Sequence, residues 1–142
     1  MSIDRTQRRV SWSLILLGFL GGCDQSPRST SGGTPGIVHV GAKYPLSDIQ
    51  VNVYKVGPSG PELVGNGVSR LDGRFELVKT GAETGLWLEP ADYAFTIESV
   101  GSVPLQWKEP LGKISKTPLR RVWSSTDVEL DMDLPEPTGK RP

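Results

Sequence analysis

The chain has 142 residues, with 16 lysine and arginine side chains against 16 aspartates and glutamates, a length that suits one domain. A formal net charge of zero removes the attraction on which non-specific nucleic-acid binding depends, so we expect no nucleic-acid partner. One cysteine cannot form an intramolecular disulfide, so a folded domain here has to be held by its apolar core.

The first 22 residues have the layout of an export signal. Three arginines lie among the first nine residues, and the run VSWSLILLGFLGG follows over residues 10–22 without a charged side chain. This run is shorter than the roughly 20 residues that a transmembrane helix needs, but it fits the apolar region of a signal peptide. We therefore predict a signal peptide over residues 1–22.

The only cysteine, Cys23, follows directly on this run. The segment Leu20-Gly21-Gly22-Cys23 resembles the lipobox of bacterial lipoproteins. The resemblance implies that a signal peptidase recognises residues 20–22 and cuts before Cys23, which carries a diacylglyceryl group and usually an acyl chain such as palmitate on its new amino group. Two or three acyl chains give stable membrane attachment, whereas one does not. The alternative is an ordinary secretory signal with a chance cysteine.

A lipid anchor implies a protein on the periplasmic or cell-surface side of a membrane, without saying which membrane. Residues 23–35 are rich in serine, threonine, proline and glycine. This composition offers too little apolar surface to pack, so we predict a lipidated flexible tether. The segment PEPTGKRP, residues 135–142, predicts a short disordered tail.

Between these ends, over residues 36–134, apolar and polar side chains alternate as in strands with one face in a core. The clearest runs are DIQVNVYKV at 48–56, DYAFTIESV at 92–100 and DVELDMDL at 127–134. Further strands are expected at 37–40, 63–68 and 119–123. The segment SRLDGRFEL, residues 69–77, predicts a hairpin at Asp72-Gly73 with Phe75 and Leu77 pointing inward. About seven strands predict an all-β fold, a small antiparallel β-sandwich.

The order of these features resembles the carboxypeptidase regulatory-like, or transthyretin-like (prealbumin-like), β-sandwich domain. The motifs that carry the resemblance are Pro45-Leu46, Asp72-Gly73-Arg74-Phe75 and Pro90-Ala91-Asp92-Tyr93. The closing segment, residues 103–134, is similar to that of small bacterial lipoproteins with this domain. The chain departs from the family at Ala91, where a turn glycine is usual, and in GAETGLWLE, residues 81–89. The resemblance implies a transthyretin-like sandwich over residues 36–134.

The sequence offers no catalytic centre. His39, the only histidine, alternates with Val38 and Val40, so we predict a surface imidazole with no catalytic partner. Transthyretin-like folds include hydroxyisourate hydrolase, but its site uses more than one histidine and a Tyr-Arg-Gly-Ser ending, and the chain has neither. HExxH, P-loop and CxxC motifs do not occur. We expect no enzyme activity, no catalytic residues and no cofactor.

Two charged stretches lie near the C-terminus. Acidic side chains alternate along the last expected strand, at Asp127, Glu129, Asp131 and Asp133. Carboxylates in a straight row at about 6.6 Å intervals do not converge on a cation, so we predict a solvated face and no metal site. The preceding basic residues are Lys108, Lys113, Lys116, Arg120 and Arg121. A hairpin of 119–123 with 127–134 would pair these charges, and the alternative is contact with anionic lipid or wall polymer.

Three tryptophans survive the predicted processing, Trp87, Trp107 and Trp123. Trp107 is expected to pack, and Trp87, in the unusual segment, is the candidate for ligand binding because an exposed indole stacks on sugar rings. We predict a lipid-anchored, non-enzymatic β-sandwich module of the cell envelope that has a structural role or contacts an envelope protein or glycan. The alternative is a carbohydrate- or small-ligand-binding lipoprotein that uses the loop around Trp87. An enzyme would need His39 clustered with carboxylates.

Overall fold

The structure, a computed structural model, describes residues 32–138. Within them the chain forms nine strands, one 3-10 turn and no α-helix. The elements are β1 Pro35–Val40, η1 Gly41–Lys43, β2 Tyr44–Pro45, β3 Ile49–Gly57, β4 Gly60–Val68, β5 Arg74–Glu76, β6 Val78–Lys79, β7 Ala91–Ser99, β8 Arg120–Trp123 and β9 Leu130–Asp133. The all-β prediction is confirmed.

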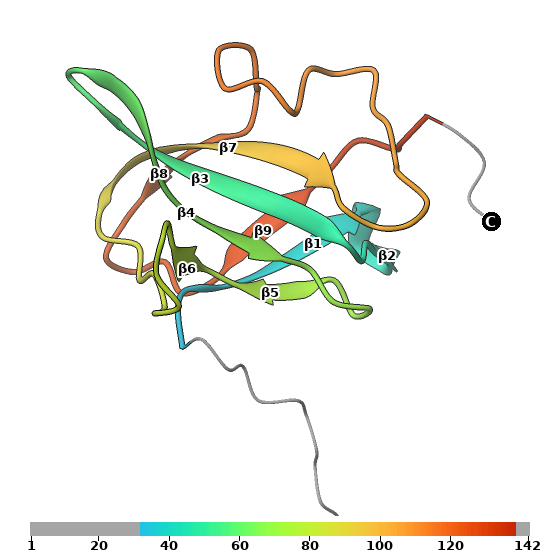
Figure 1. Cartoon of the computed structure of the whole chain (residues 1–142), viewed down its shortest axis with the longest axis horizontal. Coiled ribbons are helices and arrows are strands. Elements are labelled where there is room, and N and C mark those ends of the chain that lie inside the picture. Colours follow the sequence, from blue (N-terminus) through green and yellow to red (C-terminus); the bar gives the residue numbers. More distant parts are fainter. Residues whose placement is uncertain (1–31, 139–142) are drawn as a thin grey trace, which may run out of the picture.

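The strands form two sheets that lie over one another (Figure 1). The five-stranded sheet has the order β6-β4-β3-β7-β8, and all of its pairs are antiparallel. In the four-stranded sheet, β1 pairs antiparallel with β2 and β5 and parallel with β9. The fold is therefore a β-sandwich as predicted, although one strand pair is parallel and there are nine strands where about seven were expected.

The core lies between the two sheets and receives side chains from both. The largest fully buried side chains are Phe75, Phe95, Ile49, Leu77, Leu130, Val38, Val51 and Val53. Burial of each such side chain stabilises the fold by roughly 1.5–3 kcal/mol. Phe75 and Leu77 point inward, as the pattern of residues 69–77 predicted.

The turn at Asp72-Gly73 forms, but it connects the two sheets and not two strands of one hairpin. Gly73 adopts a φ of 77°, while Asp72 is not among the described residues with positive φ. The Gly73 amide donates to the Arg70 carbonyl at 2.8 Å, and the Arg70 amide donates to the Arg74 carbonyl at 2.9 Å. The hairpin prediction was wrong because β4 stays in the five-stranded sheet while β5 pairs with β1.

The hairpin considered for residues 119–134 does not form. β8 pairs with β7, where Arg121 lies opposite Tyr93, and β9 pairs with β1, where Met132 lies opposite Val38. β9 belongs to the other sheet, where Leu130 and Met132 are buried in the core. Cross-strand pairing therefore does not explain the basic stretch. Among the described residues one ion pair joins the two stretches, Arg121 to Asp127 at 3.2 Å.

Described contacts continue beyond both ends of the expected domain, residues 36–134. Thr34, in the last part of the predicted tether, is 3% exposed. Beyond the other end, Trp107 Nε1 donates to the Pro135 carbonyl at 2.9 Å, and the Thr138 amide donates to the Gln106 carbonyl at 2.6 Å. The domain thus includes polar segments on either side of its strands, because their backbone groups find partners on it.

Candidate functional site

The predicted lipidation motif, Leu20, Gly21, Gly22 and Cys23, lies outside the described residues, with the rest of the predicted signal peptide and residues 23–31 of the tether. So do residues 139–142 of the predicted tail. In residues 32–138, no helix has the length and apolar character needed to cross a bilayer.

Trp87, the predicted binding residue, is strongly exposed, with 64% of its surface open to solvent. Its neighbours Leu86 and Leu88 are partly buried and pack against the core. The alternation turns the indole away from the core. Trp123 is buried, and Trp107 is half-buried against the core as expected. Trp87 is thus the exposed tryptophan of the described chain.

Hydrogen bonds to Thr34 fix the backbone on both sides of Trp87. The Thr34 amide donates to the Leu86 carbonyl at 2.8 Å, and Thr34 Oγ1 accepts the Leu88 amide at 2.8 Å. The Leu86 amide donates to the Leu77 carbonyl at 2.9 Å. Since these contacts order the backbone before any ligand arrives, binding at Trp87 loses little conformational entropy in this segment.

Two glycines permit the close approach of this segment to the sandwich. A Cβ at Gly33 would lie 1.9 Å from the Leu77 carbonyl oxygen, and a Cβ at Gly65 would lie 2.3 Å from that of Val78. The Gly65 Cβ would also meet Leu86 Cδ2 at 2.6 Å. No other residue fits at either position without moving the backbone. Neither role was predicted from the sequence, where Gly33 falls in the expected tether.

A hollow of about 360 Å³ lies beside Trp87. It is lined by Lys55, Val64, Lys79, Gly85, Leu86, Trp87, Glu89 and Tyr93. We name it the Trp87 hollow. It borders the end of the core, because Val53 is the last fully buried side chain of β3 and Lys55 follows it on the same face. Apolar, aromatic and charged groups therefore meet in one concavity.

Tyr93 forms the buried side of the Trp87 hollow. Its side chain is 4% exposed, and its hydroxyl donates to the Glu89 carbonyl at 2.9 Å. Burial raises the pKa of Tyr93 above its ordinary value of 10.0, and the negative charge of Glu89 adds to this shift. The phenol is consequently neutral at physiological pH, and it holds the backbone of Glu89 at the rim.

His39 lies on the outer face of β1 as predicted, but it has partners that the sequence analysis did not find. Nε2 donates to the carboxylate of Asp131, and Nδ1 donates to the Gly41 carbonyl at 2.6 Å. The Asp133 carboxylate lies 3.5 Å from Nδ1 and accepts the Gly41 amide at 2.9 Å. These contacts depend on the parallel pairing of β1 with β9, and the local pattern of either strand does not reveal that pairing.

The partners of His39 favour its protonated form, since an imidazolium alone donates from both nitrogens. Partial burial lowers the pKa of His39, but the hydrogen bonds to Asp131 and Gly41 and the charges of Asp131 and Asp133 outweigh it. The pKa is therefore raised above 6.5. With both nitrogens directed at acceptors, the protonated ring has no lone pair free to take a proton from a nucleophile.

The acids of the last strand divide among separate partners. Asp131 and Asp133 face His39, and Glu129 pairs with Arg74 at 3.3 Å. Asp131 and Asp133 remain about two-thirds exposed, at 66% and 64%. In the part of the chain that the structure describes, no group of three or more His, Cys, Asp or Glu side chains is arranged to hold a metal ion.

Of the sites considered, the Trp87 hollow combines an exposed aromatic face with a fixed backbone and a concave, partly polar lining. The pattern that singled it out in the sequence was the departure of residues 81–89 from the domain family that the sequence resembles. Comparison of the chain with protein-family models, with curated proteins and with solved structures finds no match.

Proposed function

We propose that the chain is a lipid-anchored, non-enzymatic β-sandwich module of the cell envelope that contacts a glycan through the Trp87 hollow. The observation that carries the glycan role is the exposed indole of Trp87, held on a fixed backbone beside a concavity. A sugar ring presents an apolar face that stacks on an aromatic plane, while its hydroxyls need polar groups at the rim. Lys55, Lys79 and Glu89 supply such groups.

The non-enzymatic part of the proposal is supported by the contacts of His39. His39 directs both ring nitrogens at acceptors, so it is not placed to act as a general base for a molecule in its hollow beside Tyr44 and Asp72. The proposal accordingly assigns recognition, and no bond-breaking step, to the described domain. Its partners are a membrane, through the anchor, and an envelope glycan.

The anchor rests on the likeness of residues 20–23 to a lipobox. The tether enters the domain at Thr34, which is bonded to the residues flanking Trp87. Eleven residues from Cys23 to Thr34 span at most roughly 40 Å of extended chain. An anchored protein would therefore hold the Trp87 hollow within that reach of the bilayer, where a surface glycan is accessible.

Kinship with the transthyretin-like domain is part of the proposal. Its support is the order of the sequence motifs together with a two-sheet fold. Leu46 of the Pro45-Leu46 motif is buried, and Gly73 supplies the positive φ of the turn before Phe75.

Two variants of the full chain, expressed in a bacterium, test this function. Cys23→Ser should lose acyl mass and membrane partitioning, while wild type loses residues 1–22 and partitions to the membrane. Trp87→Ala should keep the anchor and bind oligosaccharides at least tenfold more weakly, because the stacking face is gone. Equal partitioning of wild type and Cys23→Ser would remove the anchor, and undiminished glycan binding by Trp87→Ala would remove the site.

A further inference from the structure

Lysines occupy core-facing positions at the border of the Trp87 hollow. Along β3 the core face carries Ile49, Val51 and Val53, and Lys55 is next in this series. Lys55 lies opposite Tyr93 of β7, whose side chain forms the buried side of the hollow. Lys79 of β6 lies opposite Gly65 of β4, which is itself opposite Val53. Two ammonium groups therefore stand where the core ends and the hollow begins.

Both ammonium groups are available to a ligand. The ion pairs of the described residues involve His39, Arg74 and Arg121, and none includes Lys55 or Lys79. Glu62 lies opposite Lys55 across the strand pair, yet the two form no ion pair within this part of the chain. The hollow contains one carboxylate, that of Glu89, so its lining keeps a positive excess.

We infer that the Trp87 hollow binds an anionic sugar, whose ring stacks on Trp87 while its carboxylate or phosphate is held by Lys55 and Lys79. This inference rests on the proposed function and names the ligand class of the same site. An uncharged sugar would leave two unpaired ammonium groups beside it, whereas an anionic group supplies charge-assisted hydrogen bonds to both. Charge complementarity thus selects among sugars that stack equally well.

The test compares sugars that differ only in charge, by calorimetric titration of the full chain in an uncharged detergent. One pair is trigalacturonate and its fully methyl-esterified form, and the other is maltotriose phosphate and maltotriose. We expect at least one anionic sugar to bind ten or more times as tightly as its uncharged counterpart. The two pairs show whether a carboxylate or a phosphate is preferred. Added salt should reduce this preference, because exposed charges are screened.

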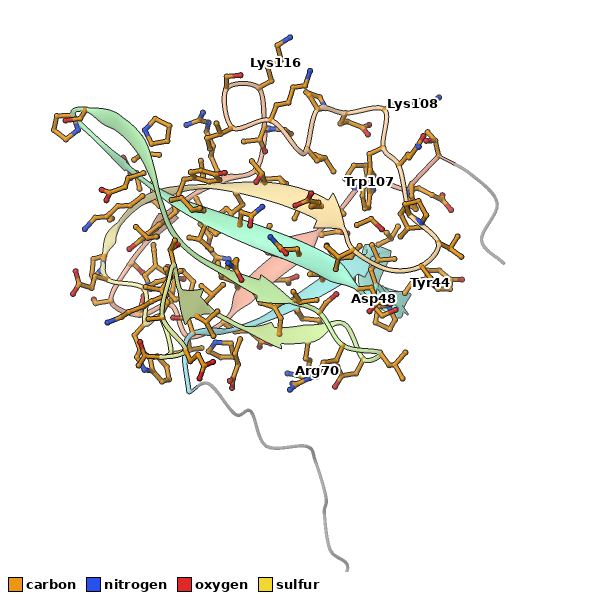
Figure 2. All side chains as sticks on the ribbon, viewed as in Figure 1. Tyr44, Asp48, Arg70, Trp107, Lys108 and Lys116 are labelled. Carbon is orange, nitrogen blue, oxygen red and sulfur yellow. The ribbon has the colours of Figure 1, made fainter. Side chains whose placement is uncertain are left out.

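The variant pair Lys55→Gln/Lys79→Gln should abolish the preference, because it weakens binding of the anionic sugar far more than binding of its uncharged counterpart. The matched control is Lys108→Gln/Lys116→Gln. Figure 2 shows Lys108 and Lys116 projecting from the connection between β7 and β8, at the opposite end of the view from β6. All four lysines are exposed, so neither double variant should lower the melting temperature.

Each result separates the ligand class from the proposed function. Equal affinity for charged and uncharged sugars, with binding lost in Trp87→Ala, would overturn the anionic ligand and keep the glycan site. The role of Lys55 and Lys79 would be overturned if the anionic preference survived Lys55→Gln/Lys79→Gln. It would also be overturned if the control variant Lys108→Gln/Lys116→Gln removed the preference. Absence of binding to all four sugars would overturn both proposals.

Discussion

His39 of β1 and Asp131 of β9, 92 residues apart in the chain, are joined by a hydrogen bond across the parallel strand pair of the sandwich. The bond ties the last strand to the first on the outer face of the four-stranded sheet. On the inner face, Val38 and Met132 of the same pair are buried. Protonation of His39 is therefore coupled to the closure of the fold.

We predict that stability falls as the pH rises above about 6.5 and through the folded-state pKa of His39. The pKa of His39 is raised in the folded state above 6.5, so the folded protein holds this proton more tightly than the unfolded chain. The stability that protonated His39 contributes is fully present below about pH 6.5 and is lost as the pH rises through the folded-state pKa. Melting temperatures across this range measure it, and His39→Gln should flatten the slope. An unchanged slope in His39→Gln would contradict the coupling.

Asp127 has the opposite dependence in a different pH range. Its pKa is lowered below 3.8, first by the hydrogen bond from the Ser124 amide and further by the Ser124 hydroxyl and by Arg121. The stability that this carboxylate contributes is present above about pH 4 and is lost as the pH falls through the folded pKa. It therefore does not disturb the slope assigned to His39.

The strands were predictable because alternation is a local property. The alternating pattern predicts β3 from residues 48–56 and β7 from residues 92–100, because one face of each strand lies in the core. The partner of a strand is not a local property. The segment DVELDMDL fits equally well beside β8 or β1. The hairpin considered from the sequence would pair it with β8, whereas the structure pairs it with β1.

The candidate site, like the strand pairing, depends on contacts between residues that are far apart in the sequence. Trp87 stood out because its segment departs from the pattern of the domain family that the sequence resembles, and the structure leaves Trp87 exposed. The residues that position it are distant in sequence: Thr34 bonds Leu88 from 54 residues away, and Gly65 makes room for Leu86. A threonine in a Ser/Thr/Gly/Pro-rich stretch and a glycine in a strand carry no local sign of such contacts.

Gly65→Ala is expected to destabilise the sandwich and to disturb the Trp87 hollow. The added Cβ would lie 2.3 Å from the Val78 carbonyl oxygen and 2.6 Å from Leu86 Cδ2, so β6 or the Leu86 side chain has to move. Overpacking of this kind costs about 1–3 kcal/mol. Urea denaturation measures the cost, with Gly57→Ala as control because its Cβ meets nothing within 4 Å. Equal stability of both variants would show that this close approach is not needed.

Thr34→Val is expected to loosen the segment that presents Trp87. Valine keeps the shape of threonine but leaves the Leu88 amide without its acceptor, at a cost of about 1–3 kcal/mol. Thr34→Ser retains the hydroxyl and should lose less stability. Hydrogen exchange of the Leu88 amide is the direct measurement, and it should accelerate in Thr34→Val alone. Equal acceleration in both variants would show that the Thr34 hydroxyl is not what protects the Leu88 amide.

Phe75→Ala is expected to be the most damaging of these substitutions, because the ring occupies space that two glycines leave empty. A Cβ at Gly36 would meet Phe75 Cζ at 2.2 Å, and one at Gly67 would meet Phe75 Cδ2 at 2.7 Å. Gly36 belongs to β1 and Gly67 to β4, so the ring fills the interior between the two sheets.

With no side chain on either glycine to fill the cavity, Phe75→Ala should lower the free energy of unfolding by about 3–5 kcal/mol. That is a large part of the roughly 5–15 kcal/mol that holds a typical domain folded. Leu71→Ala, at a side chain 89% exposed, should change the unfolding free energy by less than about 0.5 kcal/mol. If urea denaturation gives Phe75→Ala a loss below about 1 kcal/mol, the two sheets close over the missing ring, and Phe75 does not set their separation.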